Sequence, residues 1–272
     1  MRLVTVRHNG ATRAGRVEDD RIVLLDHIDV NELLAHNDWL QIAAATGDSI
    51  DLDEASLAPV TPRPPKIICL GLNYMGHIRE MGREPPAYPT LFAKYTSALI
   101  GARDPIRIPS VVNKMDWEVE LGVVIGKPAR NVSVDVALDH VAGYTVVNDI
   151  SARDWQMRTT QFLQGKTFEA TTPVGPSLVT PDELPMGAKG LAVRCEVDGV
   201  VMQHDNTAEM IFDVATTIAY LSQIFTLEPG DLIATGTPDG VGAGRTPPVW
   251  LCRGQTVRTV IEGVGELVNR CE

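Results

Sequence analysis

Two apolar segments of this chain carry acidic residues where a buried β-strand would ordinarily have none. Residues 117–125 read Trp-Glu-Val-Glu-Leu-Gly-Val-Val-Ile, and residues 142–149 read Ala-Gly-Tyr-Thr-Val-Val-Asn-Asp. β-Branched and aromatic residues dominate both segments and Gly interrupts each, which is typical of strands. Because alternate side chains of a strand point to the same face, Glu118 and Glu120 would project together, away from their apolar neighbours.

Two interpretations fit this Glu-x-Glu pattern. Half-exposed strands often alternate in this way, so both carboxylates could lie on the solvent face of an edge strand. However, residues 123–125 continue the strand as an unbroken apolar run, which favours burial on both faces. Two buried carboxylates repel each other, so their burial is costly unless a cation lies beside them or one of them is protonated.

Asp149 closes the second segment and adds a third carboxylate to the first two. No His or Cys accompanies the three, so the expected site is made of oxygen ligands only. Such a site suits Mg²⁺, Mn²⁺ or Ca²⁺ better than zinc.

Composition narrows the classes of partner. With 272 residues, 44% hydrophobic and 22% charged, the chain has room for one or two globular domains with a sizeable core. Its net charge of −11 argues against nucleic acid or an anionic membrane as partner. It does not argue against a small anionic substrate, because a local cation can reverse the field inside a pocket.

Targeting signals and cysteines add expectations about location. No run reaches the roughly 18 apolar residues of a membrane helix, and the first residues have no signal-peptide core. The four cysteines are scattered, without a Cys-x-x-Cys pair. We therefore expect free thiols and a cytoplasmic protein.

A proline-rich stretch at residues 59–65 is the best candidate for a domain boundary. Four of its seven residues are Pro, which predicts a stiff, extended connector. Residues 1–58 are expected to form a small N-terminal domain, a surface appendage, and residues 66–272 the main domain. The appendage would contain a β-meander and then one helix, capped by Asn31 and ending at Gly47.

Further along the chain, alternating and helical patterns predict more elements. These are short strands at 106–109 and 249–251, a hairpin over 191–203 and an amphipathic helix over 208–224.

His77 and Glu80 lie in a short segment that reads as one or two helical turns. Positions three apart on a helix are neighbours, so the two side chains can touch. A carboxylate beside an imidazole raises its basicity and fixes its tautomer, as a general base requires. A surface His paired with a Glu would look the same in the sequence.

Several polar side chains near these segments are candidates for substrate contacts. Lys94 reads equally well as a surface charge or as a cation that faces an anionic ligand. Arg153 and Gln156 follow Asp149 on one helical face and could bind a carboxylate and a carbonyl, although a solvated polar face explains each alone. Lys166, between Gly and an aromatic residue in a loop stiffened by prolines, fits a positioned cation.

A loop of Gly and Thr residues at 235–242 follows a short strand. Its backbone N–H groups and hydroxyls could bind an oxyanion. Its spacing excludes both the P-loop and the dinucleotide-binding fingerprint.

Five motifs in this order resemble the fumarylacetoacetate hydrolase family over residues 66–272, in particular its branch of acylpyruvate hydrolases and 2-hydroxyhepta-2,4-diene-1,7-dioate isomerases. The motifs are Gly-Leu-Asn-Tyr-x-x-His-x-x-Glu at 71–80, Trp-Glu-x-Glu-Leu-Gly at 117–122, Asn-Asp-x-Ser-x-Arg at 148–153, Gly-Lys-Thr-Phe at 165–168 and Thr-Gly-Thr-Pro at 235–238.

The resemblance implies a β-rich α+β fold, a mixed β-sandwich roll with a small N-terminal α+β domain, usually as a homodimer. It implies a divalent metal, Mg²⁺ or Mn²⁺, on Glu118, Glu120 and Asp149, and a small anionic 2-oxo acid as substrate. The catalytic residues it implies are His77 and Glu80, which activate water, and Lys166, which stabilises an oxyanion or protonates an enolate. The substrate-binding residues it implies are Arg153, Gln156, Gly236, Thr237, Tyr74 and Lys94.

Three hypotheses follow for function. The first is a metal-dependent hydrolase that cleaves a C–C bond in a 1,3-diketo acid such as fumarylpyruvate, with pyruvate enolate as leaving group. The alternative is a decarboxylase or isomerase of 2-oxo diacids, of the oxaloacetate or 2-oxohept-3-ene-1,7-dioate type, on the same fold and metal site. A non-enzymatic scaffold would predict a disrupted site, whereas every expected position is filled.

Overall fold

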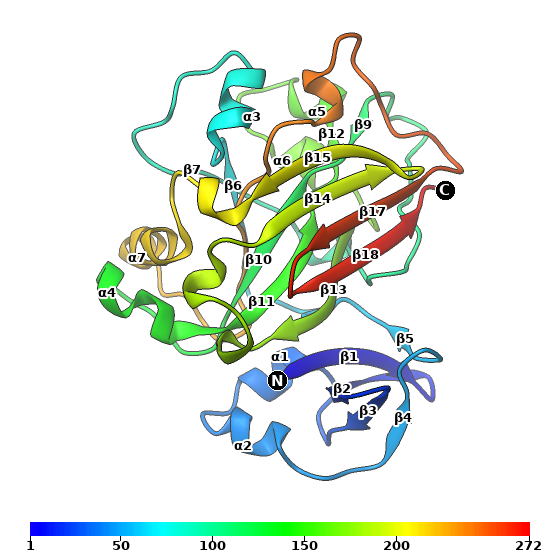
Figure 1. Cartoon of the computed structure of the whole chain (residues 1–272), viewed down its shortest axis with the longest axis vertical. Helices are drawn as coiled ribbons and strands as arrows, with labels where there is room; N and C mark the ends of the chain where they lie inside the picture. Colours follow the sequence, from blue (N-terminus) through cyan, green and yellow to red (C-terminus); the bar gives the residue numbers. More distant parts are fainter.

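The computed structural model describes all 272 residues and is dominated by β-sheet, with short helices at the edges (Figure 1). The largest sheet has 12 strands. In spatial order they are β4 (Ser49–Asp51), β3 (Arg21–Leu24), β2 (Ala11–Glu18), β1 (Arg2–His8), β13 (Thr172–Val179), β11 (Val141–Asn148), β10 (Val119–Ile125), β16 (Leu232–Ala234), β6 (Ile67–Gly71) and β7 (Thr90–Ala93), with β5 (Ser56–Leu57) on β1 and β8 (Leu99–Ile100) on β13.

Two smaller sheets and the helices complete the chain. The four-stranded sheet is β15 (Val200–Asn206), β14 (Ala192–Val197), β17 (Thr256–Ile261) and β18 (Gly265–Arg270), and the two-stranded sheet is β12 (Ser151–Ala152) and β9 (Met115–Asp116). The α-helices are α1 (Val30–Leu34), α2 (Trp39–Ala43), α3 (Met75–Glu80), α4 (Val134–Ala137), α5 (Arg153–Gln156), α6 (Leu163–Lys166) and α7 (Val214–Ile224). The 3₁₀ turns are η1 (Thr96–Ala98), η2 (Leu138–His140), η3 (Pro181–Glu183), η4 (Met186–Ala188), η5 (Thr207–Glu209) and η6 (Gly242–Gly244). None of these helices has the length and apolar character needed to cross a lipid bilayer.

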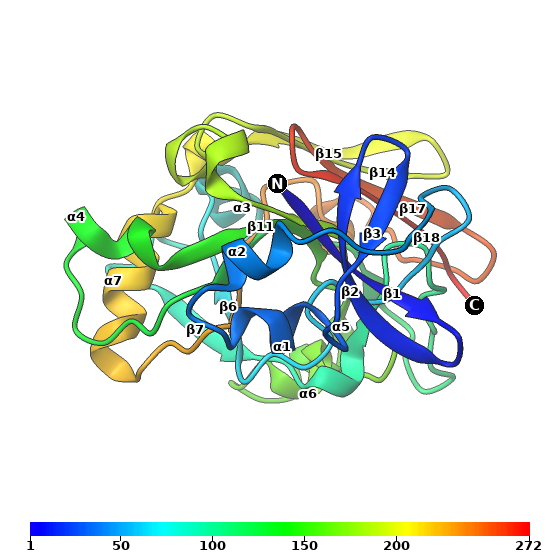
Figure 2. The same ribbon diagram turned by 90° about the horizontal axis from the view of Figure 1, so that it is seen from below.

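The four-stranded sheet packs across the middle of the large one (Figures 1 and 2). Strand β18 packs against β13 and β11, and strand β14 packs against β10. A cluster of 39 buried apolar residues fills the space between them and extends to α7. The β-rich sandwich with helices at its edges confirms the expected fold class.

The strand that carries the acidic residues is buried on both faces. Val119, Leu121 and Val123 belong to the cluster between the two sheets, whereas Val124 belongs to a second cluster on the opposite face. β10 also has a neighbour on each side, β11 and β16, so it is an interior strand. The solvent-exposed alternative for its carboxylates is therefore excluded.

The N-terminal segment extends the main sheet and is not a surface appendage. β1 pairs with β13 through Arg2 and Leu3, and in Figure 1 its strands lie directly below β13. Leu33 and Trp39 share one buried cluster with Val124, on the face of the central sheet away from the four-stranded sheet. Because an isolated 58-residue segment could bury little apolar surface by itself, this shared core explains why the segment docks so closely.

The helical part of that segment differs from the sequence expectation. Asp29, not Asn31, caps α1, because its side chain accepts the Glu32 N–H at 2.8 Å. The Asn31 side chain instead donates to the Gly230 carbonyl and accepts the Arg63 N–H. The expected continuous helix is interrupted at residues 35–38, so that two short helices, α1 and α2, form.

Three other expected elements need correction. Residues 106–109 contain only an isolated bridge from Ile106 to Cys271, and residues 249–251 form no strand. The helix expected from residue 208 begins at Val214, because Asp213 accepts the Thr216 N–H and caps it there.

Asn73 fixes the start of α3 against two distant segments. Its side chain is fully buried, donates to the carbonyls of Phe212 and Thr235 at 3.0 and 2.7 Å, and accepts the Phe212 N–H at 2.8 Å. These bonds hold the β6–α3 connection beside the loop that follows β16. His77 is thereby placed relative to that loop.

We expect Asn73→Ala to lower the free energy of unfolding by about 3 kcal/mol, because it removes three hydrogen bonds between the buried Asn73 side chain and backbone groups of Phe212 and Thr235. Thermal unfolding monitored by circular dichroism measures the effect. The control is Asn113→Ala at an exposed position, which should change stability by less than about 0.5 kcal/mol. Equal melting temperatures for the two variants would contradict the role of Asn73.

Candidate metal centre and active site

Glu118, Glu120 and Asp149 meet as the sequence predicts. One carboxylate oxygen from each lies within 4.8 Å of the others, and all three side chains are buried. The antiparallel register produces this meeting: Val119 pairs with Asn148, and the Asp149 N–H donates to the Glu118 carbonyl at 2.8 Å. The carboxylates come together where β10 begins and β11 ends.

Two buried lysines contact these carboxylates. Lys166 Nζ lies 2.6 Å from Glu118 Oε2 and 2.8 Å from Asp149 Oδ2, and Lys94 Nζ lies 2.5 Å from Asp149 Oδ1. Burial alone would lower the pKa of Lys166, but Asp149 and Glu118 outweigh it and raise that pKa above its usual value. Lys166 is therefore an ammonium group that can donate hydrogen bonds.

The donor set fits a divalent cation. Glu120 has no cationic partner, and its one hydrogen bond comes from the Gly236 N–H at 2.8 Å. Burial, then Asp149 and Glu118, raise the pKa of Glu120 well above its ordinary value. Burial would raise the pKa of Glu118 as well, but Lys166 and Arg153 outweigh it and lower that pKa. An all-oxygen cluster with one uncompensated carboxylate is what Mg²⁺, Mn²⁺ or Ca²⁺ would bind.

A cavity of about 670 Å³ opens onto these groups. It collects most of the residues that the sequence singled out, from four separate parts of the chain: His77, Glu118, Glu120, Arg153, Gln156, Lys166 and Thr237. Such convergence of charged groups on one concave space is typical of an active site.

His77 and Glu80 touch across one turn of α3, as predicted. Nδ1 of His77 lies 3.3 Å from Glu80 Oε2, and Glu80 Oε1 accepts the Gly240 N–H at 2.9 Å. His77 is 7% exposed and lines the cavity. The surface-pair alternative is therefore excluded, and Nε2 is the ring nitrogen left for a ligand.

Arg153 is held by the protein through each of its guanidinium nitrogens. Nε donates to Asp116 at 2.8 Å, Nη1 donates to Gln156 Oε1 at 3.0 Å, and Nη2 forms an ion pair with Glu118 Oε1 at 2.7 Å. In this arrangement Arg153 holds Glu118 and Gln156. The bidentate clamp on a substrate carboxylate that the sequence suggested is not free to form.

Three other residues that the sequence assigned to substrate do not line the cavity. Gly236 holds Glu120, and its φ of +95° together with the closeness of Asn73 explains why a glycine is needed. Lys94 is buried against Asp149. Tyr74 lies in the apolar core with a hydroxyl that has no partner, so it is a packing residue. Thr237 does line the cavity, and its hydroxyl donates to the Val119 carbonyl.

Asp116 is a site residue that the sequence analysis missed. It is fully buried, and its carboxylate accepts the N–H groups of Trp117, Gly242 and Ala243 as well as Nε of Arg153. The signal was present, because residues 116, 118 and 120 alternate as acids with the period of a strand. Asp116 ties the loop after β16 to the cation beside Glu118.

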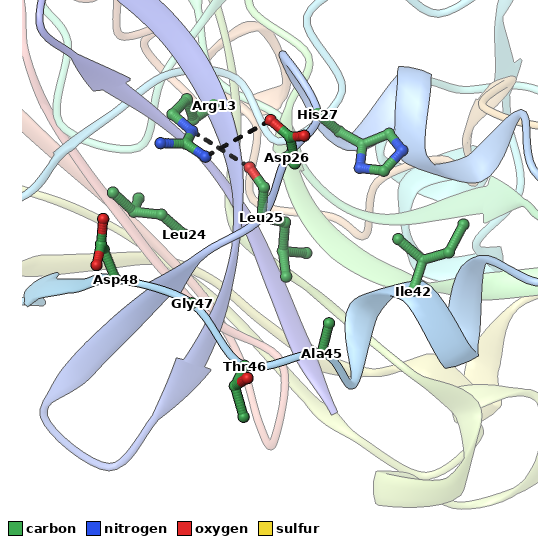
Figure 3. Close-up of a pocket in the computed structure, with 10 residues that line it drawn as sticks. All are labelled: Arg13, Leu24, Leu25, Asp26, His27, Ile42, Ala45, Thr46, Gly47 and Asp48. Atoms are coloured by element: carbon green, nitrogen blue, oxygen red, sulfur yellow. Dashed lines mark hydrogen bonds and ion pairs between the residues drawn. The ribbon is translucent and has the colours of Figure 1, made fainter.

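A second, smaller hollow of about 410 Å³ lies in the N-terminal segment (Figure 3). All its lining residues fall between Arg13 and Asp48, and none belongs to the carboxylate cluster. Figure 3 shows the one arginine there directed at Asp26, and the two lie 4.0 Å apart. The charged residues that the sequence singled out therefore line the larger cavity and not this one.

Comparison with known proteins gives this site a family. The pattern of the fumarylacetoacetate (FAA) hydrolase C-terminal family matches residues 66–272, and that of an N-terminal family, Rv2993c-like, matches residues 1–59. The chain belongs to the fumarylacetoacetate hydrolase family. Members of this family are enzymes that act on keto acids and use divalent metals, in agreement with the carboxylate cluster.

Relatives within the family carry several activities. The mitochondrial oxaloacetate tautomerase of Xenopus laevis is 47% identical over 215 residues, which cover 78% of this chain and 67% of that protein. The 2-hydroxyhepta-2,4-diene-1,7-dioate isomerase of Mycobacterium marinum superimposes with a TM-score of 0.82 at 35% identity, over 100% of this chain and 98% of that one. The maleylpyruvate hydrolase of Sphingobium does so with a TM-score of 0.82 at 32% identity, over 100% and 99%.

If Mg²⁺ binds to the carboxylate cluster, it should stabilise the folded protein, and Glu120→Gln should remove that stabilisation. A cation at about 100 times its Kd stabilises the folded protein by about 2.7 kcal/mol, so Mg²⁺ should raise the melting temperature of the unchanged protein. Scanning calorimetry with Mg²⁺ and with EDTA measures the difference. Glu169→Gln, at an exposed residue without an ion pair, should keep the full shift. A shift of the same size in Glu120→Gln would contradict the assignment.

Asp116→Asn should destabilise the protein by about 3–5 kcal/mol, since it breaks a buried ion pair and replaces an acceptor by an amide. Urea unfolding followed by tryptophan fluorescence measures the change. Asp139→Asn, at an exposed residue without an ion pair, is the matched control. A loss below about 1 kcal/mol would show that the Asp116–Arg153 contact is not a structural anchor.

Proposed function

We propose that this protein is a divalent-metal-dependent enzyme that interconverts the keto and enol forms of a 2-oxo acid, as a tautomerase or isomerase. The observation that carries the proposal is the buried carboxylate cluster with the Lys166 ammonium and the His77 imidazole on one cavity. The 47% identity to an oxaloacetate tautomerase supports placing tautomerisation ahead of hydrolysis. The sequence motifs alone had placed hydrolysis first.

The proton transfer follows from groups of this chain. Glu118, Glu120 and Asp149 would hold a divalent cation, whose positive charge would stabilise an enolate. His77, with Nδ1 toward Glu80, presents Nε2 to the cavity and takes a proton from the carbon beside the substrate carbonyl. Lys166 Nζ donates a hydrogen bond to the oxygen on which negative charge develops and passes it the proton that completes the enol. In the enol-to-keto direction the same groups act in reverse: the oxygen gives its proton to Lys166, and His77 returns a proton to the carbon.

A second candidate is hydrolysis of the C–C bond of an acylpyruvate. The specific observation in its favour is the His77–Glu80 pair, which could deprotonate a water molecule in the same cavity. The structural likeness to a maleylpyruvate hydrolase also supports it. Decarboxylation of oxaloacetate belongs to the same group of reactions, because it too passes through an enolate.

Other parts of the sequence interpretation remain proposals of the same kind. They are Mg²⁺ as the physiological metal, a homodimer, a cytoplasmic location and a domain boundary at residues 59–65.

The decisive experiment assays purified protein with Mg²⁺ on oxaloacetate and on acylpyruvates, and follows enol absorbance, CO₂ and pyruvate. We expect metal-dependent conversion of enol oxaloacetate to the keto form, abolished by EDTA. His77→Gln should lower kcat by about 10²–10⁴-fold, the usual contribution of a general base, and Glu169→Gln should not lower it. Cleavage of acylpyruvates without tautomerase activity would select the hydrolase, and CO₂ release alone the decarboxylase.

A further inference from the structure

We propose that the mouth of the cavity holds a second anion subsite, formed by Arg83 and Arg158, which binds the distal carboxylate of a 2-oxo dicarboxylic acid. The inference rests on the proposed function, because the first carboxylate and the oxo group would occupy the buried end of the cavity. Both arginines line the cavity and both are exposed, whereas the carboxylate cluster is buried.

The first argument is one of charge. Two other cations line the cavity, and both are committed: Lys166 to Glu118 and Asp149, and Arg153 to Asp116 and Glu118. The side chains of Arg83 and Arg158 have no acidic group within 4.0 Å and no hydrogen bond. Acidic residues outnumber basic ones in the chain, 35 to 24, and yet neither arginine has an acidic partner. Both guanidinium groups are therefore available to bind the negative charge of a ligand.

Arg158 is held in place without an acidic partner. Its guanidinium lies 3.4 Å from the centre of the Trp155 ring. Trp155 is fixed in turn, because its indole N–H donates to the Val111 carbonyl at 3.1 Å and its ring meets Phe168 edge-on. A stacked guanidinium keeps its in-plane N–H groups free to form the paired bonds that a carboxylate accepts.

Arg83 is positioned by the end of α3. Gly82 has a φ of +61° and donates its N–H to the Arg79 carbonyl at 3.0 Å, and the Arg83 N–H donates to the Ile78 carbonyl at 2.9 Å. This pair of bonds is the usual glycine-terminated end of a helix. Since Ile78 is fully buried, the backbone of Arg83 is anchored to the helix that carries His77.

The remaining lining suits a short carbon chain. Met81, Met157 and Phe162 add apolar surface to the lining of the same cavity. An apolar acyl tail would use these contacts but leave both guanidinium groups without an anionic partner. A dicarboxylic acid satisfies both parts of the lining, so we assign diacids as the substrate class.

The test compares two ligands of equal length in the presence of Mg²⁺. 2-Oxoglutarate and 2-oxopentanoate each have five carbons and differ only in the distal carboxylate. Titration calorimetry on the unchanged protein should show 2-oxoglutarate binding at least ~10-fold more tightly, the lower range for charge-assisted hydrogen bonds. Arg83→Gln and Arg158→Gln should each reduce that ratio, and the double variant should bring it near one.

The controls separate the subsite from general damage. Arg79→Gln, on the exposed side of α3 and outside the cavity lining, should keep the full ratio. Arg158→Lys should restore part of it, because the charge remains but the planar fork is lost. The affinity for 2-oxopentanoate should stay within about 2-fold in all these variants, since that ligand offers no carboxylate at the subsite.

Three results would overturn the subsite: equal affinities for the two acids in the unchanged protein, no binding of 2-oxoglutarate, or an equal loss for both acids in the arginine variants. The proposed function fails separately. If the calorimetric ratio behaves as expected but no 2-oxo diacid is enolised, cleaved or decarboxylated, the subsite stands and the assigned chemistry does not.

Discussion

The repulsion among three buried carboxylates is the constraint on which the rest of this structure depends. Glu118, Glu120 and Asp149 meet because β10 and β11 pair in one register, and that register also places the apolar residues of both strands in two separate cores. A one-residue slip would turn Val124 and the carboxylates toward the other face. The large hydrophobic sandwich therefore does two things at once: it stabilises the fold, and it holds like charges together at a cost that cations must offset.

The three carboxylates of this cluster differ in how many cationic partners they have. Lys94 and Lys166 compensate Asp149 and Glu118, while Glu120 contacts only a backbone N–H. An uncompensated carboxylate of this kind would attract a divalent ion, which under the proposed function would stabilise the enolate of a 2-oxo acid. Tautomerases, isomerases and hydrolases can share such a site because each needs the same enolate.

Connections between distant segments hold the parts of the site together. Asn73 links α3 to residues 212 and 235, Asp116 links the loop after β16 to Arg153, and Glu80 accepts an N–H from the same loop. The loop at residues 235–243 thus contacts Glu120 of the carboxylate cluster, Glu80 beside His77, and Asp116, which anchors Arg153. Its role is to position other groups, which differs from the oxyanion-binding role that its Gly and Thr content first indicated.

The sequence by itself determined the two acid-bearing strands, the three carboxylates and the His77–Glu80 contact, because these depend on local periodicity: two residues per repeat in a strand, three or four in a helix. It also contained the alternation that includes Asp116, which was overlooked. Only the tertiary structure decided that Arg153 serves Glu118 instead of a ligand, that Tyr74 is core, that residues 1–58 extend the main sheet, and that Arg83 and Arg158 share a cavity. Each of these depends on which residues far apart in the chain become neighbours, and charge pairing, unlike periodicity, is set by distance in space.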